Sequence, residues 1–205
     1  MMDAAQLLSL FAQAYGEGRW WSSDPFCVMF QSVLVQNTSW SSVEIVPVPC
    51  AHDVLSMSQE DLERIVRPCG FFHAKARAVR ALAEWYASYG FDCEAVKAMP
   101  VRLLRKQLLS IRGIGPESAD DILVYAFHKP LMIVDAYTRR LLERMGYVFT
   151  CDDGIRSWAC ASLGDDAEAY GHLHWYVLDH CISYCRKKPA CVACPVSHSC
   201  LRMGL

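Results

Sequence analysis

Four cysteines toward the carboxyl end of the chain are spaced as ligands of a soft metal centre. Cys185, Cys191, Cys194 and Cys200 form the pattern C-x5-C-x2-C-x5-C. Four thiolates in one short loop suit an iron–sulfur cluster or zinc, and the spacing alone does not separate the two. Cys181 is an alternative to Cys185 as the first ligand. The chain has 11 cysteines, an odd number whose clustering favours a metal site over disulfides.

A single acid, Asp135, directly follows the apolar run 130–134 and precedes a helical pattern. Aspartate is a favoured helix N-cap, so the simplest interpretation of Asp135 is structural. A capping carboxylate is also held rigidly and points outward, which a catalytic group needs. The two roles are therefore compatible.

Upstream, Gly113, Ile114 and Gly115 separate two predicted helices, of which the first ends at Arg112 and the second begins at Pro116. Two glycines around one apolar residue allow bare backbone amides and a helix N-terminus to approach a phosphate. Ile114 would anchor the turn in the core. The alternative is an ordinary corner between helices, because short glycine motifs recur widely.

These residues need elements to position them, and the predicted elements are short helices. Apolar spacing predicts helices over 4–15, 25–34, 58–66 and 74–89, and from Pro100 to about Ile111. The segment 43–50 is predicted to be extended, because Pro47 and Pro49 each remove a donor and clash one turn back. No long stretch alternates with period two, so the fold class is all-α.

Composition allows a folded protein and limits the partners. The 205 residues are 53% hydrophobic and 20% charged, which excludes a disordered tail. The net charge of −2 speaks against nucleic acid, but what matters is whether basic groups cluster, as several do between Lys97 and Arg140. No signal peptide or membrane span is visible. We expect a soluble, cytoplasmic protein.

Several motifs in order resemble the helix–hairpin–helix-Gly/Pro-Asp superfamily, the endonuclease III family of DNA glycosylases. They are Leu34-Val-Gln-Asn-Thr38, Arg67-Pro-Cys-Gly-Phe-Phe-His-Ala-Lys-Ala76, Ile111-Arg-Gly-Ile-Gly115 and Val134-Asp135. The resemblance extends from about Trp20 to Cys200. It implies a bilobal helical protein that binds damaged double-stranded DNA in a cleft, with Asp135 stabilising the oxocarbenium-like sugar as the base leaves.

The resemblance also implies domain boundaries. Residues 22–130 would form a six-helix barrel lobe that holds the hairpin at about 107–127. Residues 1–21 and 131–205 would form a terminal lobe with a [4Fe–4S] cluster loop at 185–200, because the family ends in a nearly identical cysteine loop. Lys187 and Lys188 would contact phosphates beside this loop, as would Gly113, Ile114 and Gly115 in the hairpin.

Glu117 decides the expected chemistry. Bifunctional family members have a lysine two residues after the second hairpin glycine, where it forms a Schiff base and nicks the strand. Here that position is Glu117, and a carboxylate cannot form an imine. The chain resembles most the endonuclease III-related 3-methyladenine glycosylases, in which a glutamate at this place and the aspartate 18 residues later face the base. The alternative for Glu117 is a solvated residue of a first helical turn.

Aromatic residues complete the expected base pocket. Trp40 follows the Gln-Asn-Thr motif where that subgroup has an aromatic that stacks on the base, and Trp20 and Trp21 are candidates for the opposite wall. Core packing is the alternative for each tryptophan. Gln36 resembles the glutamine that fills the gap left by a flipped base, with a turn or capping role as its alternative.

The expected protein is thus a monomeric, monofunctional base-excision-repair glycosylase for an alkylated base, associated with the nucleoid in a bacterium. One alternative is a glycosylase and lyase for oxidised pyrimidines, as in endonuclease III. The other is a DNA-damage-binding protein without catalytic activity. The irregular segment 45–49 is the feature that would favour this alternative.

Overall fold

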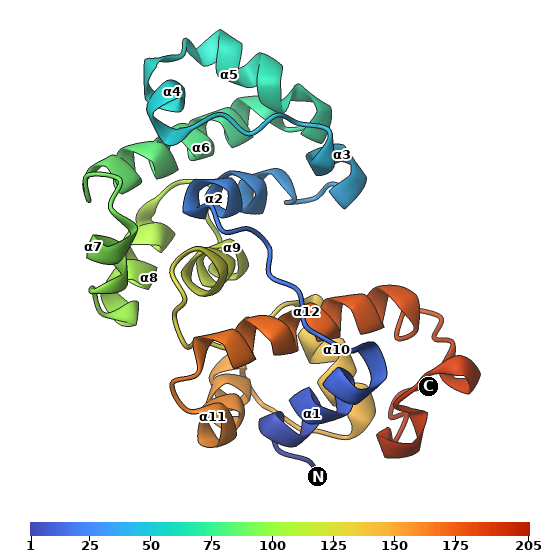
Figure 1. The fold of residues 1–205 in the computed structure, drawn as a ribbon. Coiled ribbons are helices and arrows are strands. Elements are labelled where there is room, and N and C mark those ends of the chain that lie inside the picture. The colour runs from blue at the N-terminus through green and yellow to red at the C-terminus, as the bar shows by residue number, and fades with distance from the viewer. The chain divides into compact units, whose positions relative to one another are not determined.

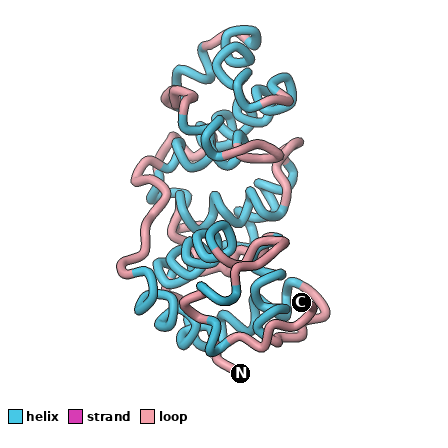
Figure 2. Tube along the Cα trace, turned by 90° about the vertical axis from the view of Figure 1, so that its right-hand side faces the viewer, coloured by secondary structure: helices cyan, strands magenta, loops and turns pink.

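The computed structural model describes all residues, 1–205, and every regular element in it is helical (Figure 2). The predicted all-α class is therefore confirmed. The chain divides into two compact units. One is formed by the uninterrupted stretch 21–129, called here the hairpin unit. The other combines residues 1–20 with residues 130–205 and is called the terminal unit.

The hairpin unit is built around a buried helix, α2 (Pro25–Leu34). Asp24 caps its start, and Pro25 occupies the first turn, as the sequence predicts. Helix α2 packs against α6 (Phe72–Ala87), α9 (Pro116–Asp121) and the π-helical turn η2 (Ile122–Ala126). The remaining helices of this unit are α3 (Trp40–Glu44), α4 (Ala51–Ser56), α5 (Gln59–Val66), η1 (Arg67–Cys69), α7 (Cys93–Lys97) and α8 (Val101–Ser110).

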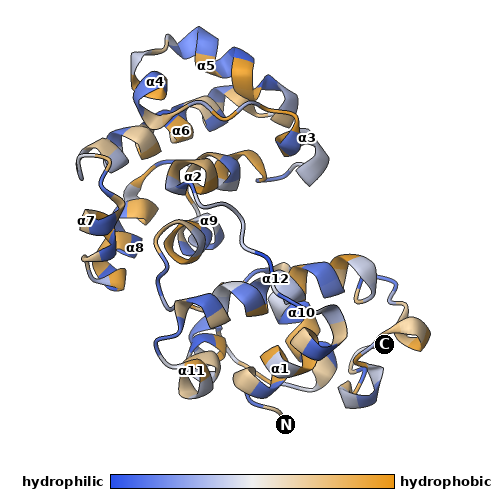
Figure 3. Ribbon diagram, viewed as in Figure 1, coloured by the Kyte–Doolittle hydropathy of each residue, from blue (hydrophilic) through white to orange (hydrophobic).

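Helix α5 shows how the amphipathic pattern folds. Ser58 caps it by accepting from the amide of Asp61, as its helix-start pattern predicts. Leu62 and Val66 are buried, whereas Arg64 pairs with Asp61 on the exposed face. Figure 3 shows strongly polar and strongly apolar residues side by side on this helix.

The segment predicted to be extended is partly helical. Helix α3 includes Val43 and Glu44. It ends before Pro47, and Val43 is buried. The prolines act only further on, and residues 47–50 have no regular structure. Two other helices differ from their predicted bounds: the helix predicted over 74–89 spans 72–87, and the helix before the hairpin ends at Ser110, two residues before Arg112.

The terminal unit has four main helices, α1 (Ala4–Tyr15), α10 (Ala136–Met145), α11 (Asp152–Leu163) and α12 (Ala167–Ser183) (Figure 1). Helix α1 has the predicted bounds, and Asp3 and Gln6 form a capping box at its start. Its buried face, with Leu7 and Phe11, packs against α11 and α12. Two short 3-10 turns, η3 (Cys191–Ala193) and η4 (Ser197–Ser199), lie in the cysteine loop. No helix has the length and apolar character needed to cross a membrane.

A buried lysine joins three segments of the hairpin unit. The Nζ of Lys75 donates to the carbonyl of Leu34, at the end of α2, and to the carbonyl of Cys69, at 2.9 and 2.7 Å. Burial lowers the pKa of Lys75, with the Cys69 thiol opposing that effect. The ammonium satisfies two carbonyls that the helix ends leave open.

We expect Lys75→Met to lower the free energy of unfolding by about 1–3 kcal/mol, because it leaves two buried carbonyls without a donor. The measurement is the urea midpoint, and Lys106→Met, at an exposed position on α8, is the matched control. Equal midpoints for the two variants would show that Lys75 does not hold these segments together.

Candidate active site

Asp135 lies at the junction of an extended segment and a helix. Residues 132–134 are buried and have no regular structure, and they lead to Asp135, the N-cap of α10. The amide of Thr138 donates to its Oδ1 at 2.7 Å. Only 2% of the Asp135 surface is exposed. The predicted capping role is thus what the local geometry shows, with a carboxylate fixed from one side. The outward orientation expected for a cap is wrong here, because the carboxylate is buried.

The second oxygen of Asp135 faces a histidine from another helix. The Nε2 of His174, on α12, lies 3.8 Å from Oδ2, and His174 is also buried. Burial alone would raise the pKa of Asp135, but the His174 ring and hydrogen bonding by Thr138 outweigh it and lower that pKa. Asp135 is therefore ionised at neutral pH, as a group that faces developing positive charge must be.

The glycine turn in the hairpin unit has the predicted form. Gly113 adopts φ +100°, Ile114 is buried, and Gly115 is the N-cap of α9 with Pro116 in the first turn. The amide of Ile114 donates to the carbonyl of Ile111 and closes the turn at 3.1 Å. Open space surrounds the Cα of Gly115 on its side-chain side. Backbone amides at this turn can therefore be approached closely.

Gln36 braces this turn in the structure. Its Nε2 donates to the carbonyl of Gly113 at 3.1 Å and to Oγ of Ser118 at 2.9 Å. This arrangement corresponds to the turn role considered for Gln36. Insertion into a DNA stack would require Gln36 to release both partners, and that role stays a prediction.

Glu117 is exposed on the first turn of α9, one residue after the proline. A carboxylate at this position interacts favourably with the helix N-terminus. The neighbouring Asp120 is buried and forms an ion pair with Arg105 of α8 at 2.6 Å, which ties the two hairpin helices together. The two acids of α9 thus differ: Asp120 is structural, whereas Glu117 is accessible.

Two of the three predicted tryptophans lie together. The rings of Trp21 and Trp40 meet edge to face with centroids 5.5 Å apart, and Trp40 is 40% exposed. Trp21 also packs edge to face on Tyr125 of η2, at 5.6 Å. Trp20 lies elsewhere: it packs against His172 of α12 and leaves no room for a side chain at Gly171. Its position is that of a packing residue of the terminal unit.

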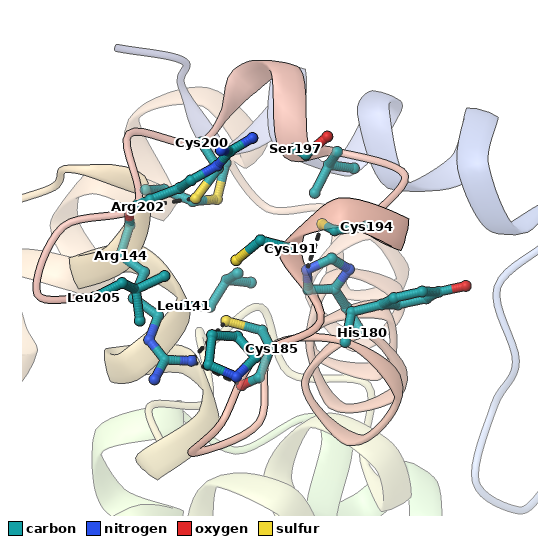
Figure 4. Close-up of a pocket in the computed structure, with 14 residues that line it drawn as sticks. Leu141, Arg144, His180, Cys185, Cys191, Cys194, Ser197, Cys200, Arg202 and Leu205 are labelled. Carbon is teal, nitrogen blue, oxygen red and sulfur yellow. Dashed lines mark hydrogen bonds between the residues drawn. The ribbon is translucent and has the colours of Figure 1, made fainter.

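The four predicted cysteine ligands surround one cavity of the terminal unit. Figure 4 shows Cys185, Cys191, Cys194 and Cys200 around a common space, with Arg144 and His180 at its edge. The cavity has about 390 Å³ of empty space, including a part that is open to solvent. No three His, Cys, Asp or Glu side chains converge as ligands of a single metal ion.

The surroundings of these thiols favour a thiolate at Cys185. A hydrogen bond from the Cys181 thiol and the nearby Arg144 guanidinium lower the pKa of Cys185, against the effect of burial. Burial and the same contact raise the pKa of Cys181, which makes it the poorer ligand of the two. Arg144 also donates to the carbonyls of Arg186 and Lys187, so the loop is held from α10 while Lys187 and Lys188 stay exposed.

The chain matches the family described as HhH-GPD superfamily base excision DNA repair protein over residues 30–154. It belongs to this superfamily. A protein of Methanocaldococcus jannaschii that bears the name of a DNA repair glycosylase is 32% identical over 96% of this chain and 94% of its own length. The chain is accordingly a base excision repair DNA glycosylase of the HhH-GPD superfamily.

Solved structures show the same fold. The 3-methyladenine DNA glycosylase of H. pylori, bound to 1,N6-ethenoadenine, has a TM-score of 0.73 at 22% identity and covers 87% of this chain and 96% of its own. Endonuclease III in a non-covalent DNA complex also has a TM-score of 0.73, at 21% identity, and covers 98% and 96%.

Three residues of the site escaped sequence reasoning. Tyr125 lies in an apolar run whose pattern does not indicate a contact with Trp21, and that contact depends on the π-helical turn. Thr138 follows its aspartate by three residues, a spacing that a capping search would have found. His174 lies 39 residues after Asp135 on a helix whose apolar spacing gives no sign of a partner, so only the fold brings it there.

The two hairpin glycines should respond differently to alanine. At Gly113 an alanine Cβ would lie 3.1 Å from that of Ala78 at φ +100°, so Gly113→Ala should cost about 1–3 kcal/mol of unfolding free energy. Gly115→Ala meets open space at φ −88° and should change stability by less than about 0.5 kcal/mol. Urea midpoints measure both, and equal losses would contradict the geometry of the turn.

Proposed function

We propose that this glycosylase is monofunctional, releases an alkylated base such as 3-methyladenine, and leaves an abasic site. The observation that carries this proposal is Glu117. It occupies the hairpin position at which bifunctional members of the endonuclease III family have lysine. A carboxylate cannot attack the sugar to form an imine. Its exposure on the first turn of α9 makes it available to a substrate.

The lysines of the hairpin unit do not replace the missing nucleophile. The Nζ of Lys129 donates to the carbonyls of Lys97 and Met99, and Lys75 is bound to two carbonyls as described above. Lys97 pairs with Glu94. Lys106 is exposed, but it lies on α8 and not on the second hairpin helix.

Asp135 would then act without a covalent enzyme–sugar bond. As the glycosidic bond breaks, its electron pair leaves with the base and positive charge develops on the sugar, which an ionised carboxylate stabilises. Water attacks the sugar and loses a proton, and we assign Asp135 as the acceptor of that proton. A base that already carries positive charge leaves as a neutral molecule, so no general acid is required.

The aromatic group in the hairpin unit suits such a base. Electron-rich rings attract a cation by about 0.5–2 kcal/mol per face. Trp40 is the accessible ring of the group, and it meets Trp21, which in turn packs edge to face on Tyr125. The nucleotide must first leave the DNA stack to reach any such ring. We assign Trp40 to the base, with Trp21 as its support, and we do not assign Trp20.

For DNA binding we propose the turn of Gly113, Ile114 and Gly115, in which the buried Ile114 is the anchor, and the exposed Lys187 and Lys188. The turn offers backbone donors and a helix N-terminus to one phosphate, which needs no lysine or arginine. This explains how a chain with net charge −2 can bind a polyanion. The hairpin unit would be the six-helix barrel lobe, and the terminal unit the cluster lobe.

The four-cysteine cavity fits a [4Fe–4S] cluster. A zinc ion would need four ligands converging on one point at about 2.3 Å, whereas in a cluster each thiolate binds its own iron around a larger body. Four thiols around one cavity supply one thiolate for each iron of such a cluster. Cys185, Cys191, Cys194 and Cys200 would hold the cluster, and its part would be to shape the loop that bears Lys187 and Lys188.

The substrate is tested with purified protein and a panel of duplexes that contain 3-methyladenine, 1,N6-ethenoadenine, thymine glycol, or a G·T or G·U mismatch. We expect release of an alkylated adenine and strand breaks only after alkali. Asp135→Asn should reduce release by at least about a hundredfold, because it removes the charge that faces the sugar. Its DNA affinity should stay unchanged.

Other outcomes of this panel have definite meanings. Strand breaks without alkali, or an adduct trapped by borohydride, would exclude a monofunctional enzyme; Lys106→Ala would then identify or exclude that lysine. Release of thymine glycol alone would indicate an endonuclease III-like specificity. DNA binding without release from any duplex would indicate a damage-binding protein.

The cluster is tested by metal analysis of protein purified without oxygen. We expect iron and sulfide in equal amounts and a broad visible absorption band, both lost in Cys191→Ser. Cys151→Ser, at an exposed cysteine outside the loop, should keep both. Zinc in place of iron would refute the cluster assignment.

A further inference from the structure

We propose that His174 is a positioning residue for the reaction, which holds the second oxygen of the Asp135 carboxylate in a fixed orientation. This inference rests on the proposed catalytic role of Asp135. It concerns a residue of the long helix α12, which sequence reasoning did not connect with the site.

The geometry around the carboxylate is asymmetric. Oδ1 accepts the 2.7 Å bond from the amide of Thr138, which belongs to the same helix turn. Oδ2 has the Nε2 of His174 at 3.8 Å, a distance of electrostatic contact and not of a direct hydrogen bond. The cap fixes Oδ1, so the orientation of the carboxylate plane depends on the group that lies beside Oδ2.

Helix α12 keeps His174 in a fixed position. It packs against α1 and α10, and Tyr170, Leu173 and Val177 around His174 are buried. The histidine therefore presents its ring from a rigid element, which a loop residue would not do. A group that must be oriented for catalysis gains most from such a support.

Several polar and charged groups of the packed helices contact residues other than this pair. On α10, Arg139 binds Asp152, and Arg140 donates to the carbonyl of Cys185. On α1, Tyr15 bonds His180, which lies further along α12. His174 is the titratable group recorded against the Asp135 carboxylate.

This arrangement has a chemical consequence. Burial disfavours the charged form of Asp135, and His174 opposes that effect, with help from Thr138. Without His174 the pKa of Asp135 should rise, so the carboxylate would take up a proton at a higher pH. Base release would then fall at a higher pH on the acid side of its profile.

The test compares His174→Leu, which keeps volume but removes the ring nitrogens, with His174→Gln, which keeps an N–H donor without a charge. The readout is single-turnover release of 3-methyladenine from methylated duplex DNA across a range of pH. We expect His174→Leu to slow release about tenfold or more at neutral pH and to move the acid limb to higher pH. His174→Gln should lie between this variant and the unmodified protein in both respects.

A purely structural role for His174 predicts something else. It would lower the amount of folded protein, measured by the urea midpoint, and leave the acid limb of the folded fraction in place. The inference would be overturned if base release by both variants fell at the same acidic pH as release by the unmodified protein. If His174→Leu does not fold, the profile of His174→Gln decides alone.

A second readout needs no activity and separates this inference from the proposed function. Urea midpoints of Asp135→Asn, His174→Leu and the double variant form a cycle. Contact between the two side chains predicts that the losses are not additive, and that the coupling disappears as acid protonates Asp135. Additive losses at every pH would refute the contact even if the enzyme is active. Coupling without base release would refute only the catalytic role of Asp135.

Discussion

The hydrogen bond from the amide of Thr138 fixes the position of the Asp135 carboxylate, the group that we propose for the chemistry. A carboxylate in a buried position loses hydration, and it stays charged only if nearby groups replace the lost water. The helix start supplies one such group, and His174 lies beside the other oxygen. The extended segment before Asp135 must therefore end, and α10 must begin, at this residue.

The hairpin unit follows a different rule, because the role proposed for it is to offer backbone donors and not a charge. Gly113 allows the turn, the buried Ile114 anchors it, and Gln36 and the Arg105–Asp120 pair hold its two sides. The backbone of the turn is thus held in place by side-chain contacts. This is the element proposed to bind a polyanion in a chain with slightly negative net charge.

Local rules predicted much of the fold. Apolar spacing placed α1 and α2 to the residue and α5 nearly so, because each of these helices buries one face. Proline was misleading at 43–50, since Pro47 only prevents a helix from continuing to its own position, and α3 ends before it at Glu44. For the site, the cysteine spacing and the Gly-Ile-Gly turn were visible in the chain. The neighbours of Asp135 and of Trp21 were not, because His174 and Tyr125 reach them only through tertiary packing.

The terminal unit is discontinuous along the chain, and this affects its biosynthesis. Helix α1 leaves the ribosome before any of its partners, so Leu7 and Phe11 have no apolar surface to cover them until α11 and α12 have been translated. The hairpin unit, made from one stretch, can assemble meanwhile. A translation product that stops before α12 would therefore carry the element proposed to grip DNA without a completed catalytic half. It would be a competitor of the enzyme on DNA rather than a weak version of it.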